Sequence, residues 1–311
     1  MNNQLAHNIV REVKKVVCGK DEIISKIMMA ILAGGNILMD DIPGVGKTTM
    51  ALAFAKSMGM SNARMQFTAD VMPTDVIGFS MFNAKTQEFE QKTGPIMCNL
   101  FMADEINRTS SKTQSALLEA MEEKQVTIDG ITMKLPEPFV VIATQNPVGS
   151  AGTQNLPDSQ LDRFMICVSM GYPSIQNEIM LVTNRQDNNP IEQVIQIADA
   201  DTILAMQKEV AAMFIDEAVI RYAVELCDAT RRNEQIYLGV SPRGTLSLVN
   251  MAKAYAYVNG RTYVVPDDIQ KVFFDVTKHR IILSSKARAA HASKEAILKE
   301  IVGRIMVPGV K

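Results

Sequence analysis

The chain has 311 residues, of which 47% are hydrophobic and 21% charged, and its formal net charge is −2. This length is enough for a full hydrophobic core and predicts two domains. The near-neutral charge excludes a global basic field that would draw the protein toward nucleic acid or an acidic membrane. Cys18, Cys98, Cys167 and Cys227 form neither a C-x-x-C pair nor a disulfide ladder, so we expect buried, reduced thiols.

Targeting and membrane signals are not found in the sequence. The N-terminus lacks the basic-then-apolar pattern of a signal peptide. No stretch reaches the roughly 18 uninterrupted apolar residues of a membrane span. We therefore expect a soluble, cytoplasmic protein with no membrane span.

Two helices are predicted before the first strand. Residues 2–16 place apolar side chains at helical spacing, and a second helix follows with Asp21 as its expected N-cap. The break between them contains Val17, Cys18 and Gly19. These residues form either a plain helix–helix turn or the wall of an adenine pocket, and spacing alone does not decide between the two.

The next stretch, residues 36–50, predicts an apolar strand, a glycine-bearing turn and the start of a helix. Gly44, Gly46, Lys47 and Thr48 stand at the positions that a phosphate-binding loop requires. Glycines let backbone N–H groups approach phosphate oxygens, and the helix presents its positive end to the anion. Lys47 can reach the β- and γ-phosphates, and the Thr48 hydroxyl suits Mg²⁺. The predicted nucleotide-binding residues are Pro43, Gly44, Val45, Gly46, Lys47, Thr48 and Thr49.

One position of this loop departs from the usual pattern. Asp41 replaces the first glycine of G-x-x-x-x-G-K-[ST]. The strand before the loop and the apolar helix after it still favour nucleotide binding over an ordinary turn.

Paired carboxylates end a second apolar strand, within residues 99–107. Asp104 and Glu105 would lie at the carboxyl edge of a parallel sheet, where ligands of α/β folds bind. Asp104 would hold Mg²⁺ through its water shell, and Glu105 would orient and deprotonate the attacking water. Acidic residues also cap helices that follow strands. Downstream of Lys47 and Thr48, the catalytic interpretation is favoured.

Hairpins and a further strand are predicted around this edge. Residues 79–82 can pair with 87–90, and residues 125–135 form a hairpin around an Asp-Gly turn. A buried strand then brings Asn146 to the same edge, where it would contact the γ-phosphate or the attacking water, or form the turn before a proline. Arg163 ends a short helix, and a surface salt bridge is the commoner role of an arginine.

Beyond Pro173 the pattern predicts helices and no strand. The expected helices are 203–210, 216–230, 242–258 and 266–279. The polar link Arg185 to Pro190 is the predicted boundary. It divides the chain into an α/β nucleotide-binding domain at 1–185 and a helical lid domain at 190–311.

Several short blocks of sequence occur in a fixed order. They are Asp41–Thr48, Gln66–Asp70, Thr93–Pro95, Ala103–Arg108, Ser115–Glu123, Gln125–Gly130, Ala143–Pro147, Leu161–Phe164 and Ser241–Arg243. From Val17 to Val265 the chain resembles the MoxR family of AAA+ ATPases, in these blocks almost letter for letter. In that family a residue other than glycine at the position of Asp41 is expected.

This resemblance implies an α/β fold. It consists of an AAA+ P-loop parallel sheet flanked by helices, followed by a small all-helical lid domain. Asp104 and Glu105 would be the Walker B pair and Asn146 sensor 1. Arg163 would be an arginine finger for ATP on a neighbouring subunit, and Arg243 would be sensor 2 in the lid.

The resemblance also implies an activity and partners. ATP and Mg²⁺ would bind at the subunit interfaces of a homo-oligomeric ring, with a hexamer expected, and ATP would be hydrolysed there. Hydrolysis would drive chaperone-like remodelling, maturation or metal-cofactor insertion of client proteins, with a partner that carries a von Willebrand A-type domain.

Two other functions are to be weighed against this one. Related AAA+ branches use the same two hairpins on DNA, but the hairpin at 125–135 carries Lys134 and Asp129 rather than a basic cluster, so we expect no nucleic-acid binding. An ATP-gated scaffold with little hydrolysis is the other alternative. The presence of both Glu105 and Arg163 argues against it.

Overall fold

The computed structural model describes residues 2–146, 155–184 and 190–309. Its centre is a five-stranded sheet with the order β2-β5-β8-β1-β9. The strands are β1 (Ile37–Asp40), β2 (Asn62–Gln66), β5 (Leu100–Asp104), β8 (Val140–Gln145) and β9 (Ile166–Val168). All neighbouring pairs in this sheet are parallel, so the strands end at a common carboxyl edge.

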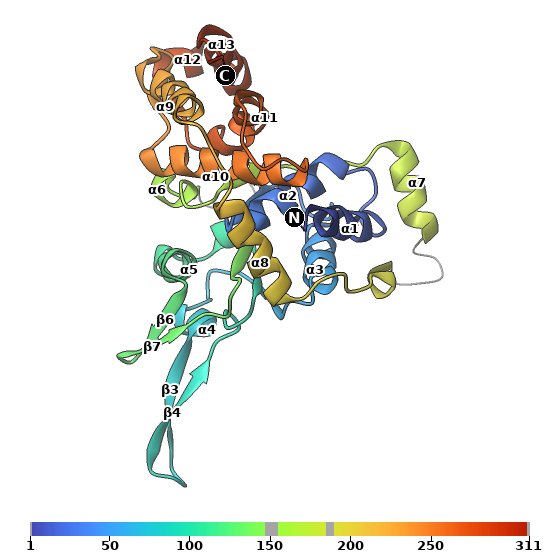
Figure 1. The fold of residues 1–311 in the computed structure, drawn as a ribbon. Helices are drawn as coiled ribbons and strands as arrows, with labels where there is room; N and C mark the ends of the chain where they lie inside the picture. Colours follow the sequence, from blue (N-terminus) through green and yellow to red (C-terminus); the bar gives the residue numbers. More distant parts are fainter. Residues whose placement is uncertain (1, 147–154, 185–189, 310–311) are drawn as a thin grey trace.

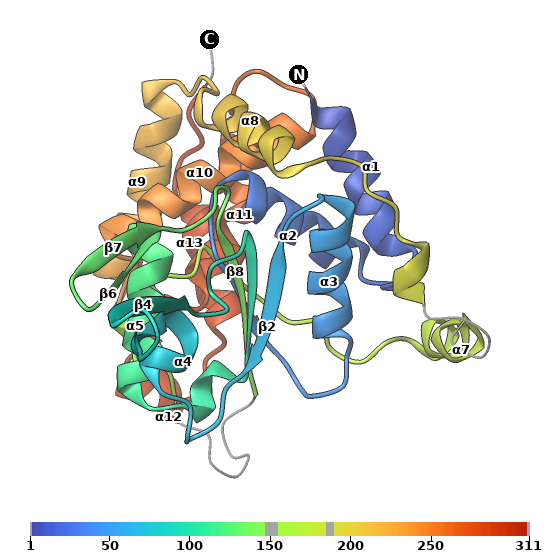
Figure 2. The same ribbon diagram turned by 90° about the horizontal axis from the view of Figure 1, so that it is seen from below.

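Helices cover both faces of the sheet, as Figures 1 and 2 show. Alternate residues of β1, β5, β8 and β9 enter two separate apolar clusters, because successive strand side chains point to opposite faces, and β2 contributes to the second cluster alone. The first cluster contains residues of α1 (Asn3–Lys14), α2 (Asp21–Leu32) and α3 (Lys47–Ser57). The second contains residues of α4 (Pro73–Ile77) and α5 (Ser111–Glu123). The α/β fold is therefore confirmed.

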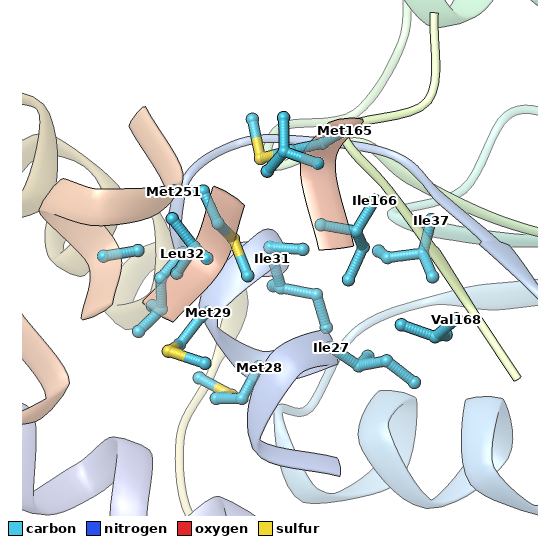
Figure 3. Packing of buried hydrophobic residues seen from close by; sticks show 14 of the residues in the cluster. Ile27, Met28, Met29, Ile31, Leu32, Ile37, Met165, Ile166, Val168 and Met251 are labelled. Carbon is cyan, nitrogen blue, oxygen red and sulfur yellow. The ribbon is translucent and has the colours of Figure 1, made fainter. Parts of the chain in front are cut away.

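The first cluster continues without a break into the C-terminal helices. Figure 3 shows side chains of α2, among them Ile27 and Ile31, between Ile37 and Ile166 of the sheet and Met251 of α10. Helices α1 and α2 also contact α10 directly. Residues 185–189 of the predicted link from Arg185 to Pro190 lie outside the described residues, so the division at 185 and 190 stays a prediction.

Both predicted hairpins are confirmed. Strand β3 (Gly78–Asn83) pairs with β4 (Glu88–Thr93), and β6 (Gln125–Ile128) pairs with β7 (Ile131–Lys134), each antiparallel. The two hairpins lie side by side, and the β3–β4 hairpin extends away from the rest of the chain (Figure 1).

The C-terminal half is mainly helical, as predicted. Its helices are α6 (Asp158–Leu161), α7 (Ile175–Asn184), α8 (Ala200–Ala211), α9 (Glu217–Arg232), α10 (Pro242–Val258), α11 (Pro266–Thr277), α12 (Ser285–Ala289) and α13 (Lys294–Arg304). The described residues also include two short 3₁₀ helices, Ile106–Arg108 and Pro190–Gln193. No helix in the described ranges is long and apolar enough to cross a membrane.

Three sequence predictions were wrong in detail. The lid contains a two-stranded antiparallel sheet of β10 (Ile236–Leu238) and β11 (Ile282–Leu283), which are too short to show an alternating pattern. Asp21 is the first residue of α2 and Lys20 its N-cap. Cys98 and Cys227 are buried, but Cys18 and Cys167 are only half-buried.

One buried arginine joins the lid to the α/β part of the chain. The Arg280 side chain is 1% exposed, and its Nε donates to Asp162 Oδ1 at 2.9 Å. Its other nitrogens donate to the carbonyl oxygens of Phe164 at 2.6 Å and Met165 at 3.1 Å. Ser241, the N-cap of α10, donates to the second Asp162 oxygen at 2.8 Å. The Asp162 carboxylate thus accepts hydrogen bonds from two lid residues, Arg280 and Ser241.

We predict that Arg280→Leu lowers the free energy of unfolding by about 3–5 kcal/mol, because one member of a buried ion pair is lost and several carbonyl groups lose their donor. Arg304→Leu is the matched control, since Arg304 is a 71% exposed arginine that pairs with Glu300 on the surface. Its effect should stay within about 0.5 kcal/mol. Urea unfolding measures both. Equal stabilities of the two variants would contradict the anchoring role of Arg280.

Candidate active site

The loop between β1 and α3 has the backbone of a phosphate cradle. Gly44 and Gly46 adopt φ angles of +84° and +97°, a region in which residues with a Cβ are strained. Gly46 is also the N-cap of α3, whose free N–H groups and positive end face the loop. Lys47 is the first helical residue, and its ammonium donates to the Asp41 carbonyl at 2.8 Å.

Asp41 ties this loop to the end of β9. One carboxylate oxygen accepts from the Ile42 N–H at 3.0 Å, and the other accepts from the N–H of Gly171 at 2.9 Å and from that of Met170. Asp41 is 5% exposed, so these backbone donors satisfy a buried charge. The residue that breaks the usual glycine pattern therefore fixes the loop in place.

A polar pocket of about 350 Å³ lies over the loop. Its walls include the loop residues Gly44, Gly46, Lys47 and Thr48, and also Asp104, Glu105 and Asn146 from the ends of β5 and β8. The structure thus brings together the predicted residues of three separate motifs. Burial lowers the pKa of Lys47, and the carboxylates of Asp41, Asp104 and Glu105 partly offset that shift.

Thr144 links the Asp104 carboxylate to the backbone of Glu105. Its hydroxyl donates to Asp104 Oδ1 at 2.6 Å and accepts from the Glu105 N–H at 2.9 Å. Glu105 itself has φ +57°, a left-handed conformation that is costly for glutamate and that recurs at functional sites. This backbone turn directs Glu105 away from the line of the strand.

The Glu105 carboxylate is held by two donors. Asn146 Nδ2 donates to Oε1 at 2.8 Å, and Arg108 Nη1 lies 2.7 Å from Oε2. Burial alone would raise the pKa of Glu105, but the hydrogen bonds from Arg108 and Asn146 outweigh it and hold the pKa below its ordinary value. Asn146 Oδ1 is buried and has no partner among the described residues, so it can accept one further hydrogen bond.

A second, more apolar pocket of about 220 Å³ shares Gly44, Gly46 and other loop residues with the first. Val17, Cys18 and Val45 line it together with Tyr172 and Leu181. Its size and apolar walls suit a planar base next to the phosphate cradle.

Gly19 takes a different part in this region. It does not line the pocket, and a Cβ placed there would lie 1.8 Å from Asn177 Nδ2 of α7. Its role is therefore to let α7 approach the break between α1 and α2.

Arg163 and Arg243 lie together, away from the phosphate loop. Arg163 Nη1 is 2.9 Å from Glu122 Oε2 and donates to the Leu118 carbonyl at 3.0 Å. Arg243 forms an ion pair with the other oxygen of Glu122. Neither arginine lines the polar pocket or the apolar one. Arg163, which follows α6, and Arg243 of α10 thus lie beside α5, and both are only partly buried.

Comparison with known proteins identifies the family. Residues 36–166 match the ATPase family associated with various cellular activities (AAA), and residues 228–301 match the AAA lid domain. The chain is 37% identical over 308 residues to Chaperone MoxR1 of Mycobacterium tuberculosis, covering 96% of this chain and 81% of that protein. This chain belongs to the MoxR family of AAA+ ATPases.

Two further similarities extend over almost the whole MoxR-type chain. It is 46% identical over 299 residues to the uncharacterized protein YeaC of Bacillus subtilis, covering 96% and 93% of the two chains. A crystal structure of a protein from Cytophaga hutchinsonii has a TM-score of 0.91 at 37% identity and covers 99% and 96%. The predicted family and fold class are confirmed.

The pocket of this MoxR-type chain also contains residues that sequence reasoning missed. Arg64 and Gln66 reach it from β2, and Thr144 supports it from β8. Strand β2 neighbours β5, so alternate residues of β2 lie beside Asp104. Strand order is the signal that would have found Arg64 and Gln66, and no local motif contains it.

The oxygen atoms in the pocket suit a hard cation. Thr48 offers a hydroxyl and Asp104 a carboxylate, and both line the same cavity. Mg²⁺ prefers such oxygen ligands and keeps several waters. The two residues that the sequence predicted for magnesium therefore fit that ion.

We predict that Arg108→Ala moves the acid limb of the ATPase pH profile to higher pH. In the wild type, Arg108 helps keep the pKa of Glu105 below its ordinary value of 4.5, so the carboxylate stays ionised as pH falls. Without the Arg108 cation, burial raises the pKa of Glu105, so its carboxylate is protonated at a higher pH. Steady-state kcat between pH 4 and 8 measures the limb, with circular dichroism as a check on folding. An unmoved acid limb would show that Arg108 does not control this carboxylate.

Proposed function

We propose that this MoxR-type protein binds ATP with Mg²⁺ and hydrolyses it to ADP and phosphate. The observation that supports this most strongly is the convergence of Lys47, Thr48, Asp104, Glu105 and Asn146 on one pocket. The AAA and lid matches support nucleotide hydrolysis as the activity of the family.

Each of these residues has a part in the proposed reaction. The backbone of Gly44 and Gly46, together with Lys47, binds the phosphates, and the positive end of α3 offsets their charge. Thr48 and Asp104 would hold Mg²⁺, which neutralises phosphate oxygens when bound. Glu105 takes a proton from the attacking water, as a general base does.

Asn146 orients both the base and the water in this proposal. Its amide nitrogen fixes Glu105 Oε1, and its free Oδ1 can accept a hydrogen bond from the water. This double contact is the role expected for sensor 1. Val17, Cys18 and Val45 would enclose the adenine in the neighbouring apolar pocket.

The arginines support a ring in which each subunit serves its neighbour. Arg163, just after α6, and Arg243 of α10 both pair with Glu122 of α5, while the apolar pocket includes residues of α7. Helices α5 and α7 lie on opposite sides of the molecule in Figures 1 and 2. A head-to-tail ring would bring the arginines of one subunit to the ATP of the next. We propose such a homo-oligomer, with six subunits.

Client proteins are the proposed substrates of the motor. The β3–β4 hairpin exposes Phe79, Met81, Phe82 and Phe89, and exposed apolar clusters commonly bind other proteins. Its neighbour, the β6–β7 hairpin, carries one lysine, Lys134, and the Asp129 turn, which does not favour a phosphate backbone. The relative Chaperone MoxR1 is named as a chaperone, which supports proteins as the clients of this chain. Remodelling, maturation or metal-cofactor insertion of clients, a von Willebrand A-type partner and a cytoplasmic location stay proposals.

We predict that Glu105→Gln binds ATP but hydrolyses it ~10²–10⁴-fold more slowly, because general bases contribute a factor of this size. Lys47→Ala should instead lose nucleotide affinity, since it removes the charge that faces the β- and γ-phosphates. Calorimetry measures binding and phosphate release measures turnover. Near-normal turnover by Glu105→Gln would refute the assignment of the base.

We predict that two inactive variants restore activity when they are mixed. Arg163→Ala should bind ATP yet hydrolyse it ~10³–10⁵-fold more slowly, as arginine fingers supply a factor of this size. Lys47→Ala has an intact finger but an empty phosphate site. In a mixed head-to-tail ring, roughly a quarter of the interfaces (one half times one half) join an intact site to an intact finger.

Phosphate release from the mixture should therefore return, at up to a quarter of the wild-type rate. Coordination around the ring would lower this value. If Arg163 acted within its own subunit, every mixed interface would be inactive. An inactive mixture with subunit exchange confirmed by mass spectrometry would exclude the trans role of Arg163.

A further inference from the structure

Arg64 contacts the carboxylate that is proposed to hold magnesium. It lies on β2, which pairs with β5, and the register places Gln66 opposite Asp104. Arg64 Nη2 is 2.6 Å from Asp104 Oδ2 and 3.2 Å from Gln66 Oε1. Both residues of β2 line the polar pocket beside Lys47 and Thr48.

Both oxygens of Asp104 are engaged, but by partners of different kinds. Oδ1 accepts from the Thr144 hydroxyl, which is itself held by the Glu105 N–H and is fully buried. Oδ2 is bonded by Arg64, whose side chain is 47% exposed. Oδ2 is therefore the oxygen on the pocket side, and its partner is the one that is free to move.

We propose that Arg64 is the internal counter-ion of Asp104 and competes with Mg²⁺ for Oδ2. The proposal rests on the metal role given to Asp104 above. Arg64 would release Oδ2 to the water shell of a bound Mg²⁺, and in the metal-free site it would pair with Oδ2. Arg64 is thus a positioning residue that acts through Asp104 and sets how strongly nucleotide binding depends on metal.

The physical basis is that two cations cannot share one carboxylate oxygen without repulsion. The guanidinium stays charged at every relevant pH, so it leaves by moving and not by losing a proton. Asp104 is buried, but the Arg64 side chain is 47% exposed, so the guanidinium can turn into solvent and leave Oδ2 to another partner. Mg²⁺ has the larger charge, and the phosphates supply it with further oxygen ligands.

Arg64 has opposite effects on ATP binding without and with the metal. Without metal, Arg64 neutralises Asp104, so a triphosphate can enter the pocket without facing a bare carboxylate. With metal, Arg64 is only a competitor. Removing its charge should therefore weaken metal-free ATP binding and strengthen Mg²⁺ binding. Both changes increase the factor by which Mg²⁺ raises the affinity for ATP.

The test compares ATP affinity in Mg²⁺ with affinity in a chelator. Calorimetry gives the ratio of the dissociation constants, chelator over Mg²⁺, for the wild type and for Arg64→Gln. We expect the ratio to rise about tenfold, which is the size of one hydrogen bond to a charged group. A Mg²⁺ titration at saturating ATP should also reach its midpoint at lower metal concentration in the variant.

Two results would overturn the proposal. An unchanged ratio would make Arg64 a structural residue of the sheet edge, since misfolding lowers both affinities alike. A lower ratio would make it a direct phosphate ligand in the metal-bound state. Arg64→Lys should shift the ratio less than Arg64→Gln, because it keeps the charge.

Matched controls separate this inference from the proposed function. Arg232→Gln removes an arginine that pairs with Asp228 on the exposed face of α9, and its ratio should equal that of the wild type. If the ATP affinity of the wild type were the same in Mg²⁺ and in chelator, the metal site itself would be refuted, and the inference with it. If Mg²⁺ raises the ATP affinity of the wild type and Arg64→Gln has the same ratio as the wild type, only the role of Arg64 is refuted.

Discussion

The parallel hydrogen bonding of β5, β8 and β1 is the constraint on which the candidate site depends. Its register pairs Ala103 with Ala143 and Asp40 with Gln145, so Asp104, Asn146 and the loop after β1 leave the sheet at one edge. A shift by one residue would turn each strand side chain to the opposite face. The buried apolar residues of these strands fix the register, because both faces of the sheet are covered. Packing of the core therefore determines the geometry of the chemistry.

The same constraint explains how much the sequence could predict. Lys47 and Thr48 belong to one local motif, and Asp104 with Glu105 ends one apolar run, so their spacing indicated their place and their chemistry. Both hairpins and the long lid helices followed from local patterns of apolar and turn residues, and the family resemblance implied the parallel sheet. Arg64 did not, because its contact with Asp104 joins residues 40 positions apart and depends on strand order. The strands of the lid are too short to carry any pattern.

The arginines show where resemblance and geometry complement each other. Spacing alone gave Arg163 the role of a surface salt-bridge residue, and its ion pair with Glu122 agrees with that interpretation. The resemblance implied that Arg163 acts on ATP bound to a neighbouring subunit. Its position away from the pocket of its own chain supports that role. The two are compatible, since Glu122 is 38% exposed and such pairs contribute at most about 1 kcal/mol. A phosphate of higher charge could take both Arg163 and Arg243 from Glu122.

The carboxylates of the candidate site have two kinds of partner. Some pair with side chains that can move, and one pairs with backbone groups that are fixed by the fold. Asp104 and Glu105 are each paired with an arginine that is partly exposed, Arg64 or Arg108, which can move. Asp41 is paired instead with backbone N–H groups, which cannot leave without disrupting the fold. The phosphate loop is therefore held in one position, while the charges around the reacting groups can change partners. A site organised in this way admits a highly charged ligand without leaving a buried carboxylate unpaired at any step.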